Sequence, residues 1–156
     1  MARFDAVDAR ILLALDRSAR APVIELASRL GLARRTVQHR ISRYEEQGML
    51  RPHSDRVPVD KLGYRVQASI SAEVRQAFLA EAVRALAEIP EVLEASATTG
   101  GWDLTCRVAA RDNEDLYRVG QLILGCPGVL RTSTSVLMAD LIPYRTTGLL
   151  IRHGEL

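Results

Sequence analysis

The sequence predicts an α+β protein of two domains, an N-terminal winged helix-turn-helix domain and a C-terminal domain with the element order βαββαβ. Two patterns along the chain carry this prediction. Residues 1–50 place apolar side chains at helical spacing in three short runs, whereas from residue 64 apolar and polar residues alternate as in a strand. The 156 residues, 47% of them hydrophobic, are enough to build two small cores.

The first two helices have recognisable ends. The first spans residues 5–17, where Asp5 is placed to cap the N-terminus and Asp8 stands three residues further on. The second begins near Pro22, a residue suited to a first turn, and ends at Gly31, which can adopt a left-handed conformation. Both helices are short, so they must pack on a third to bury a core.

The third predicted helix runs from about residue 33 to residue 47 and ends before Gly48. Small Ala27, Gly31 four residues later and apolar Val37 six residues after that form the spacing of a helix-turn-helix, because they permit a close approach and a tight turn. The face opposite the apolar residues carries cations and amides. The predicted DNA-contacting residues are Arg34, Arg35, Thr36, Gln38, His39 and Arg43.

This composition suits a major groove, since Arg pairs bidentately with guanine and Gln with adenine, while other Arg side chains hold phosphates. The alternative is an ordinary solvated face, but such a face usually mixes charge signs, and acids occur here only at Glu45 and Glu46. Residues 1–60 hold eleven Arg against eight acids, whereas the rest of the chain is nearly balanced. The predicted partner is therefore double-stranded DNA, bound through the N-terminal domain.

Residues 51–63 form the predicted linker, broken by Pro52 and Pro58, with a short strand expected at residues 57–59. Its cationic residues serve either as a wing on the DNA backbone or as a hinge that stays in solvent, and both interpretations remain open here. These residues are Arg51, His53 and Arg56.

The second half reads as strand, helix, strand, strand, helix, strand, with helices on one side of an antiparallel sheet. Gly100 and Gly101 sit where a tight hairpin joins the second and third strands. The other face of the sheet is left open for a partner. The predicted ranges are 64–74, 78–89, 91–99, 102–110, 112–125 and 128–142.

Over nearly its whole length the sequence resembles the Lrp/AsnC family of bacterial and archaeal feast/famine regulators. The matching segments are "DAVDARILLAL", "ELASRLGLARRTVQHRISRYEEQGML", "LGY", "EIPEVLEASATTGGWDLTCRV" and "CPGVLRTSTSVLM", and "TGGWD" is the most specific. The resemblance implies that the second domain is a ferredoxin-like RAM domain that binds effectors and mediates oligomerisation. The predicted division is 1–50 helix-turn-helix, 51–63 linker or wing, 64–140 RAM domain and 141–156 C-terminal extension.

The resemblance also implies an amino acid or related metabolite as effector, bound between subunits. The physical argument is that two glycines expose backbone N–H groups to a carboxylate, an aspartate accepts an ammonium group and a tryptophan forms an apolar wall. A plain hairpin in which Asp103 caps the turn is the alternative. The predicted effector-binding residues are Thr99, Gly100, Gly101, Trp102, Asp103, Thr132 and Thr134. The two threonines of the last strand match the family's TxT pattern, and they either complete the pocket from a neighbouring chain or are ordinary strand threonines.

The function predicted is a cytoplasmic, non-enzymatic transcription regulator whose assembly or DNA affinity responds to an amino acid. The family implies a homodimer and higher homo-oligomers such as an octamer. The alternative is a constitutive architectural DNA-binding protein without an effector. An RNA-recognition domain shares the βαββαβ order, but aromatic residues are only 4% of the chain.

Other classes are disfavoured by what the sequence lacks. No apolar run approaches the length of a membrane span, and no nucleophile, base and orienting group occur at a recognisable spacing. Cys106 and Cys126 fit no metal or disulfide pattern and are expected to be buried structural thiols. No catalytic residue, metal site or cofactor is predicted. Ala33 stands where the family usually has a small hydroxyl residue that caps the recognition helix.

Overall fold

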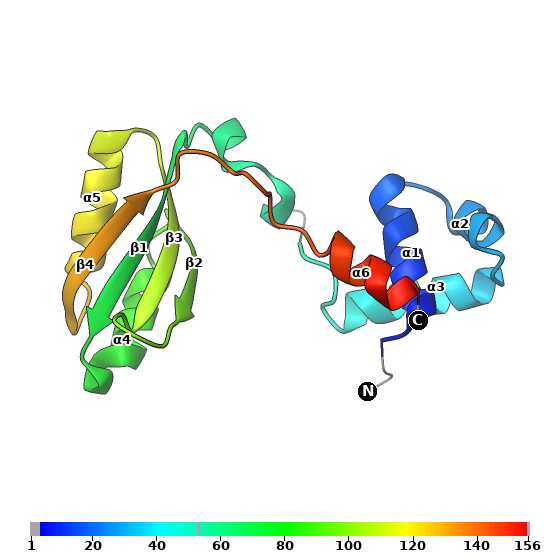
Figure 1. The fold of residues 1–156 in the computed structure, drawn as a ribbon, viewed down its shortest axis with the longest axis horizontal. Coiled ribbons are helices and arrows are strands. Elements are labelled where there is room, and N and C mark those ends of the chain that lie inside the picture. Colours follow the sequence, from blue (N-terminus) through cyan, green and yellow to red (C-terminus); the bar gives the residue numbers. More distant parts are fainter. Residues whose placement is uncertain (1–3, 53, 156) are drawn as a thin grey trace. The chain divides into compact units, whose positions relative to one another are not determined.

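The computed structural model describes residues 4–52 and 54–155, and the chain forms two compact units (Figure 1). One unit combines Met1–Asp55 with Ile142–Leu156, and the other is Arg56–Leu141. The chain therefore leaves the first unit, builds the second and returns to the first.

The first unit contains the three predicted helices, α1 (Ala6–Arg17), α2 (Val23–Leu30) and α3 (Arg34–Glu46). The predicted capping of α1 is confirmed, because the Asp5 and Asp8 side chains each accept a hydrogen bond from the other's backbone N–H. Gly31 ends α2 with φ 65°, the left-handed conformation that its position requires. Side chains from all three helices meet in one small core: Ile11, Leu26, Ala27, Val37 and Tyr44 are buried.

The C-terminal extension forms a helix, α6 (Thr147–Gly154), that packs along α1 (Figure 1). Ala9 of α1 is fully buried although it lies outside the three-helix core, and Gly154 approaches it. The rings of Phe4 and His153 meet edge to face at 5.3 Å. The helix-turn-helix domain is thus completed by residues from the far end of the chain.

The linker contains no strand within its described residues, so the short strand predicted at residues 57–59 is wrong. Two turns of 3-10 helix, η1 (Ser54–Arg56) and η2 (Val59–Leu62), take its place. Pro58 precedes η2 and its carbonyl accepts from the N–H of Lys61 at 3.0 Å, a turn that withdraws this backbone from sheet pairing. A stranded wing therefore does not form in the described part of this segment. His53 lies outside the described residues.

The second unit has the predicted βαββαβ order. It consists of β1 (Val66–Val74), α4 (Leu79–Ala87) after the turn η3 (Gln76–Phe78), β2 (Val92–Ala97), β3 (Leu104–Ala110), α5 (Asn113–Leu124) and β4 (Val129–Val136). The strands pair antiparallel in the order β2-β3-β1-β4, and α4 and α5 lie on one side of this sheet (Figure 1).

The core of this unit lies between the sheet and its two helices. Alternate residues of β1 are buried from Ala68 to Val74, as the period-2 pattern predicts, and α5 buries Leu116, Val119 and Ile123. Phe78 and Val83 lie in the predicted helical range 78–89, where their helical spacing predicts buried positions, but they are 42% and 49% exposed. The residues before Leu79 form η3 instead of a first α-helical turn, so Phe78 precedes α4 and is not part of its apolar face. No helix in the described residues is long and apolar enough to cross a membrane.

Candidate functional site

The face of α3 opposite its buried side chains is exposed to solvent. Val37 and Tyr44 are fully buried and fix the rotation of α3, because they are inserted in the core formed with α1 and α2. Within the described residues, no ion pair engages the guanidinium of Arg34 or Arg35. Five of the six predicted DNA-contacting residues lie exposed on this helix: Arg34, Arg35, Thr36, Gln38 and His39.

The N-terminus of α3 has no side-chain cap. Ala33 occupies the N-cap position with φ −65° and ψ 137° and offers no oxygen to the first helical N–H groups. The first of these N–H groups belong to Arg34 and Arg35 themselves, the first two residues of the helix. The end of α3 that carries the exposed arginines therefore also presents unsatisfied backbone donors.

The sixth predicted residue, Arg43, is placed differently from the other five. Its Nη2 lies 2.5 Å from Oδ1 of Asp8 on α1, and only 15% of its side chain is exposed. Arg40 is held in the same way, with Nη1 at 2.7 Å from both Asp8 Oδ1 and Asp5 Oδ1. The hydroxyl of Tyr44 donates to Asp8 Oδ1 at 2.7 Å. Arg43 thus belongs to a buried polar cluster between α1 and α3.

The cluster controls the ionisation of Asp8. Burial alone would raise the pKa of this carboxyl, but hydrogen bonds from Tyr44, Arg40 and the Asp5 backbone outweigh burial and lower the pKa to about 2. Burial and the bond to Asp8 raise the pKa of Tyr44. The carboxylate is therefore charged and the phenol neutral near pH 7, and the Arg43 Nε is left buried without a partner.

The loop between β2 and β3 holds the predicted effector residues. The Thr98 N–H donates to the Asp103 carbonyl at 2.9 Å and the Thr98 hydroxyl to the Trp102 carbonyl at 2.7 Å, which closes the loop. Gly100 has φ 114°, a conformation that side-chain-bearing residues rarely adopt. A Cβ at Gly100 or Gly101 would meet nothing within 4 Å, so the backbone of the loop faces open space.

The Asp103 carboxylate has partners within the chain. Its Oδ2 accepts the Val74 N–H at 2.7 Å and its Oδ1 accepts the Gln76 amide at 3.2 Å. The Asp103 N–H donates in turn to the Ala72 carbonyl at 3.0 Å. The carboxylate therefore ties the loop to the end of β1, a role different from capping its own turn.

Trp102 is covered by a cation that the sequence did not single out. The guanidinium of Arg131 on β4 lies 4.5 Å from the centre of the Trp102 ring, and its Nε pairs with Glu73 on β1 at 2.5 Å. The sequence offers one indication of this role, because Arg131 is adjacent to Thr132, a predicted effector-binding residue. Only the strand order places it beside the loop.

Thr132 and Thr134 do not join the loop within one chain. Thr132 pairs with Ala72 and Thr134 with Ile70 across β1, and both partners are buried under the helices. Residues directly opposite in antiparallel strands share a face, so the two threonines lie on the helix side of the sheet. Arg131 pairs with Glu73 on the other side.

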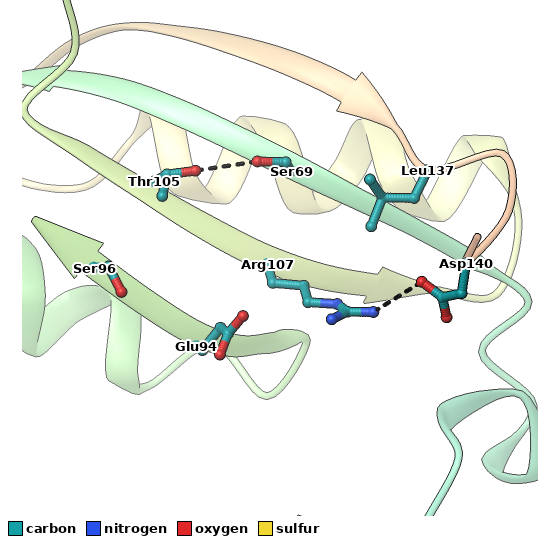
Figure 2. A pocket seen from close by; sticks show the side chains of 7 residues that line it. All are labelled: Ser69, Glu94, Ser96, Thr105, Arg107, Leu137 and Asp140. Atoms are coloured by element: carbon teal, nitrogen blue, oxygen red, sulfur yellow. Dashed lines mark hydrogen bonds and ion pairs between the residues drawn. The ribbon is translucent and has the colours of Figure 1, made fainter. Parts of the chain in front are cut away.

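The open face of the sheet carries a polar hollow of about 200 Å³ (Figure 2). Ser69 and Thr105 hydroxyls meet there at 3.1 Å, and Arg107 pairs with Asp140 at 3.6 Å. None of the predicted effector residues lines it. The lining residues are Ser69, Glu94, Ser96, Thr105, Arg107, Leu137 and Asp140.

The described residues contain no cluster of three or more side chains that could hold a metal ion. Cys106 and Cys126 are buried and unpaired, as expected for structural thiols, and burial raises the pKa of the Cys106 thiol to about 11.

Comparison with known proteins gives matches to both units. Residues 4–45 match the AsnC-type helix-turn-helix domain, and residues 67–147 match the Lrp/AsnC ligand binding domain. The chain is 30% identical to the HTH-type transcriptional regulator FL11 of Pyrococcus horikoshii, over 86% of this chain and 89% of that protein.

Solved structures match the fold as well. The structure of Escherichia coli AsnC superimposes with a TM-score of 0.81 at 27% identity, covering 92% of this chain and 98% of AsnC. The transcriptional regulator NMB0573 of Neisseria meningitidis, solved as a complex with L-Met, superimposes with a TM-score of 0.79 at 22% identity. That match covers 94% of this chain and 99% of NMB0573.

Proposed function

Since the chain belongs to the Lrp/AsnC family of transcription regulators, we propose that it binds specific DNA sequences and that a small effector modulates its assembly or its DNA affinity. The exposed face of α3 supports the first part and the loop between β2 and β3 the second. An amino acid or related metabolite is the proposed effector class.

The observation that carries the DNA-binding proposal is an exposed α3 face that holds Arg34, Arg35, Gln38 and His39, where no ion pair among the described residues engages either arginine. Arg and Gln side chains on a helix can read guanine and adenine in the major groove, and each good bidentate pair contributes about 1 to 3 kcal/mol of discrimination. Thr36 lies among them and suits a phosphate contact. Arg43 joins this face only if it leaves Asp8.

A second copy of the chain is the proposed occupant of the open sheet face. This face carries both charge signs, with Arg107 beside Glu94 and Asp140, so two copies related by a two-fold axis can match opposite charges. A homodimer of this kind would present two α3 helices to successive major grooves, about 34 to 36 Å apart. Higher assemblies such as an octamer would require further contacts between dimers.

The effector proposal rests on the chemistry of the loop. Gly100 and Gly101 leave backbone N–H groups accessible to a carboxylate, Trp102 offers an apolar surface, and Arg131 brings a cation to it. Asp103 would act mainly by holding the loop on β1, because both of its oxygens already accept hydrogen bonds. Thr132 and Thr134 would have to reach a ligand from another chain. The relative NMB0573 was solved with L-Met, which supports the amino-acid class.

Regulation would then follow from linkage. An effector changes DNA affinity only to the extent that it binds one assembly or conformation more tightly than another. A constitutive architectural DNA-binding protein remains the competing function, since it shares the α3 face and needs no effector. We propose no enzymatic activity, because the family's regulators act by binding.

The test is a DNA-shift and sedimentation titration of the protein on duplexes selected from a random pool, at fixed salt, with and without a panel of amino acids. Trp102 is the only tryptophan of the chain, so its fluorescence reports ligand binding at the loop directly. Arg35→Ala should weaken DNA binding, and Arg84→Ala on α4, also an exposed arginine but in the other unit, is the control.

Three outcomes are informative. A shift in DNA affinity or assembly that one amino acid produces, together with a Trp102 signal, would support the effector-modulated regulator. Sequence-specific binding that no amino acid alters would favour the constitutive function. Failure of the wild-type protein to bind duplex DNA would overturn both.

A further inference from the structure

Half of the arginines on α3 are turned away from solvent. Of its four arginines, Arg34 and Arg35 are exposed, whereas the side chains of Arg40 and Arg43 retain only 20% and 15% of their exposure. Both are held by Asp8, a residue of α1 that is itself fully buried. The DNA contacts proposed above make no use of Asp8.

The charges of this cluster cancel. Asp5 and Asp8 supply two negative charges, and Arg40 and Arg43 supply two positive charges at hydrogen-bond distance from them. The potential that α3 presents to DNA therefore comes from Arg34 and Arg35 and excludes the other two cations. An arginine whose partner is a buried carboxylate is not available to neutralise a phosphate.

The position of Arg43 shows that the ion pair, and not the helix, turns it inward. Arg43 follows His39 by four residues, so the two lie on the same side of α3, and His39 is exposed. The Arg43 Nε is buried without a hydrogen-bond partner, an arrangement that costs free energy and is tolerated here beside the bond to Asp8.

We propose that Asp8 is a positioning residue for DNA recognition, which holds Arg40 and Arg43 off the DNA and thereby raises the ratio of specific to non-specific binding. Non-specific affinity comes from phosphate neutralisation, whereas sequence discrimination comes from contacts with base edges. Keeping two cations away from DNA lowers the non-specific affinity. Sequence discrimination then depends on Arg34, Arg35 and Gln38. This inference rests on the proposed DNA-binding function.

The first test compares wild-type protein with Asp8→Asn, which removes the charge and keeps the size and the acceptor oxygen. Binding is measured over a range of salt concentrations to a duplex selected by the wild-type protein and to a scrambled duplex of the same length and composition. Asp5 still holds Arg40 in this variant, so the released Arg43 should steepen the slope of log affinity against log salt by about 0.9 per protomer on both duplexes. The ratio of specific to non-specific affinity should fall.

An unchanged slope in a folded Asp8→Asn protein would overturn the proposal. A loss of structure alone, with Asp8 acting only as an anchor for α1, would lower the folded fraction without making the slope steeper. The slope is therefore the readout that separates the two roles, and circular dichroism at each salt concentration establishes the folded fraction.

A second variant pair decides the question even if Asp8→Asn does not fold. Arg43→Gln keeps Arg40 and Tyr44 on Asp8, and Arg35→Gln makes the same substitution two turns earlier on the exposed face. The proposal expects no change of slope for Arg43→Gln, whereas a decrease in steepness of about 0.9 per protomer would overturn it.

The Arg34→Gln/Arg35→Gln double variant separates this inference from the function on which it rests. If α3 meets DNA as proposed, this variant must show a shallower slope than the wild-type protein. An unchanged slope there would contradict the proposed DNA-binding face. A shallower slope there together with a shallower slope in Arg43→Gln would contradict only the role of Asp8.

Discussion

At the scale of single residues, the ionised Asp8 makes the stability of the helix-turn-helix unit depend on pH. Its pKa is lowered from 3.8 to about 2 because its hydrogen-bond partners stabilise the charged form more than burial disfavours it. A carboxyl whose pKa is lower in the folded state stabilises the fold above its unfolded pKa. That contribution disappears as the pH falls from about 4 towards 2.

We therefore expect the helix-turn-helix unit to lose about 2 kcal/mol of stability between pH 5 and pH 2 through this group. Thermal unfolding followed by circular dichroism at several pH values measures the loss. Asp8→Asn should be less stable at pH 7 and should lack this part of the pH dependence. Equal acid sensitivity in both proteins would assign the effect to other carboxyl groups.

Gly128 illustrates a second constraint at this scale. Its φ is 75°, and a Cβ added there would collide with the Cβ of Phe78. We expect Gly128→Ala to destabilise the second unit by about 2 to 4 kcal/mol, because left-handed strain and overpacking add. Trp102 fluorescence during urea unfolding reports on this unit.

Gly120→Ala is the matched control, because a Cβ there would meet nothing within 4 Å and the residue lies inside α5. It should stabilise the unit by about 0.5 to 1 kcal/mol through helix propensity. Equal effects of the two substitutions would contradict the argument from geometry.

At the scale of elements, the sequence of α3 anchors the helix in the core but does little to stabilise its N-terminus. Val37 and Tyr44 hold it in the core, but its N-cap residue, Ala33, offers no acceptor for the first N–H groups. The weak start of the helix coincides with the arginines proposed to contact DNA, and a bound phosphate could satisfy the same donors.

Ala33→Ser should stabilise the helix-turn-helix unit by about 1 kcal/mol, because the serine hydroxyl supplies the missing cap. Thermal unfolding of the free protein measures this gain. Ala33→Val, which has no acceptor, should leave the melting temperature nearly unchanged. A gain of the same size for valine would show that capping is not its cause.

At the scale of the whole molecule, the N-terminal and C-terminal segments of the chain fold into one compact unit. Residues 142–156 belong to the same compact unit as residues 1–55, and α6 covers Ala9 of α1. The chain thus passes between the units twice, and the segment after β4 leads directly to a helix packed on the DNA-binding unit.

A chain ending at Leu141 should lose about 2 kcal/mol or more from the stability of the helix-turn-helix unit, because the apolar surface around Ala9 becomes exposed. Circular dichroism follows this unit, and Trp102 fluorescence shows whether the second unit keeps its unfolding midpoint. Leu149→Ser, at a 63% exposed position of α6, is the control and should change neither signal. Unaltered stability of the truncated chain would mean that α6 contributes nothing to α1.

The sequence by itself determined the elements and the fold class. Helical spacing, the capping pair Asp5 and Asp8 and the turn at Gly31 are local signals, and β1 and α5 follow from their periodicity because each has one buried face. The exposed face of α3 was predictable for the same reason. The linker strand failed, since Pro58 and a tight turn outweighed the preference of two valines for strand.

Only the tertiary structure decided which of the predicted functional residues are free to act. Arg43 pairs with Asp8 thirty-five positions away, Arg131 covers Trp102 from another strand, and Asp103 bonds to the end of β1. Helix and strand periodicity assigns a side chain to a face, but it carries no information about partners that are distant in sequence. Charge pairing of that kind depends on which elements pack together. It is therefore known only from the structure, in which α1 packs on α3 and β4 pairs with β1.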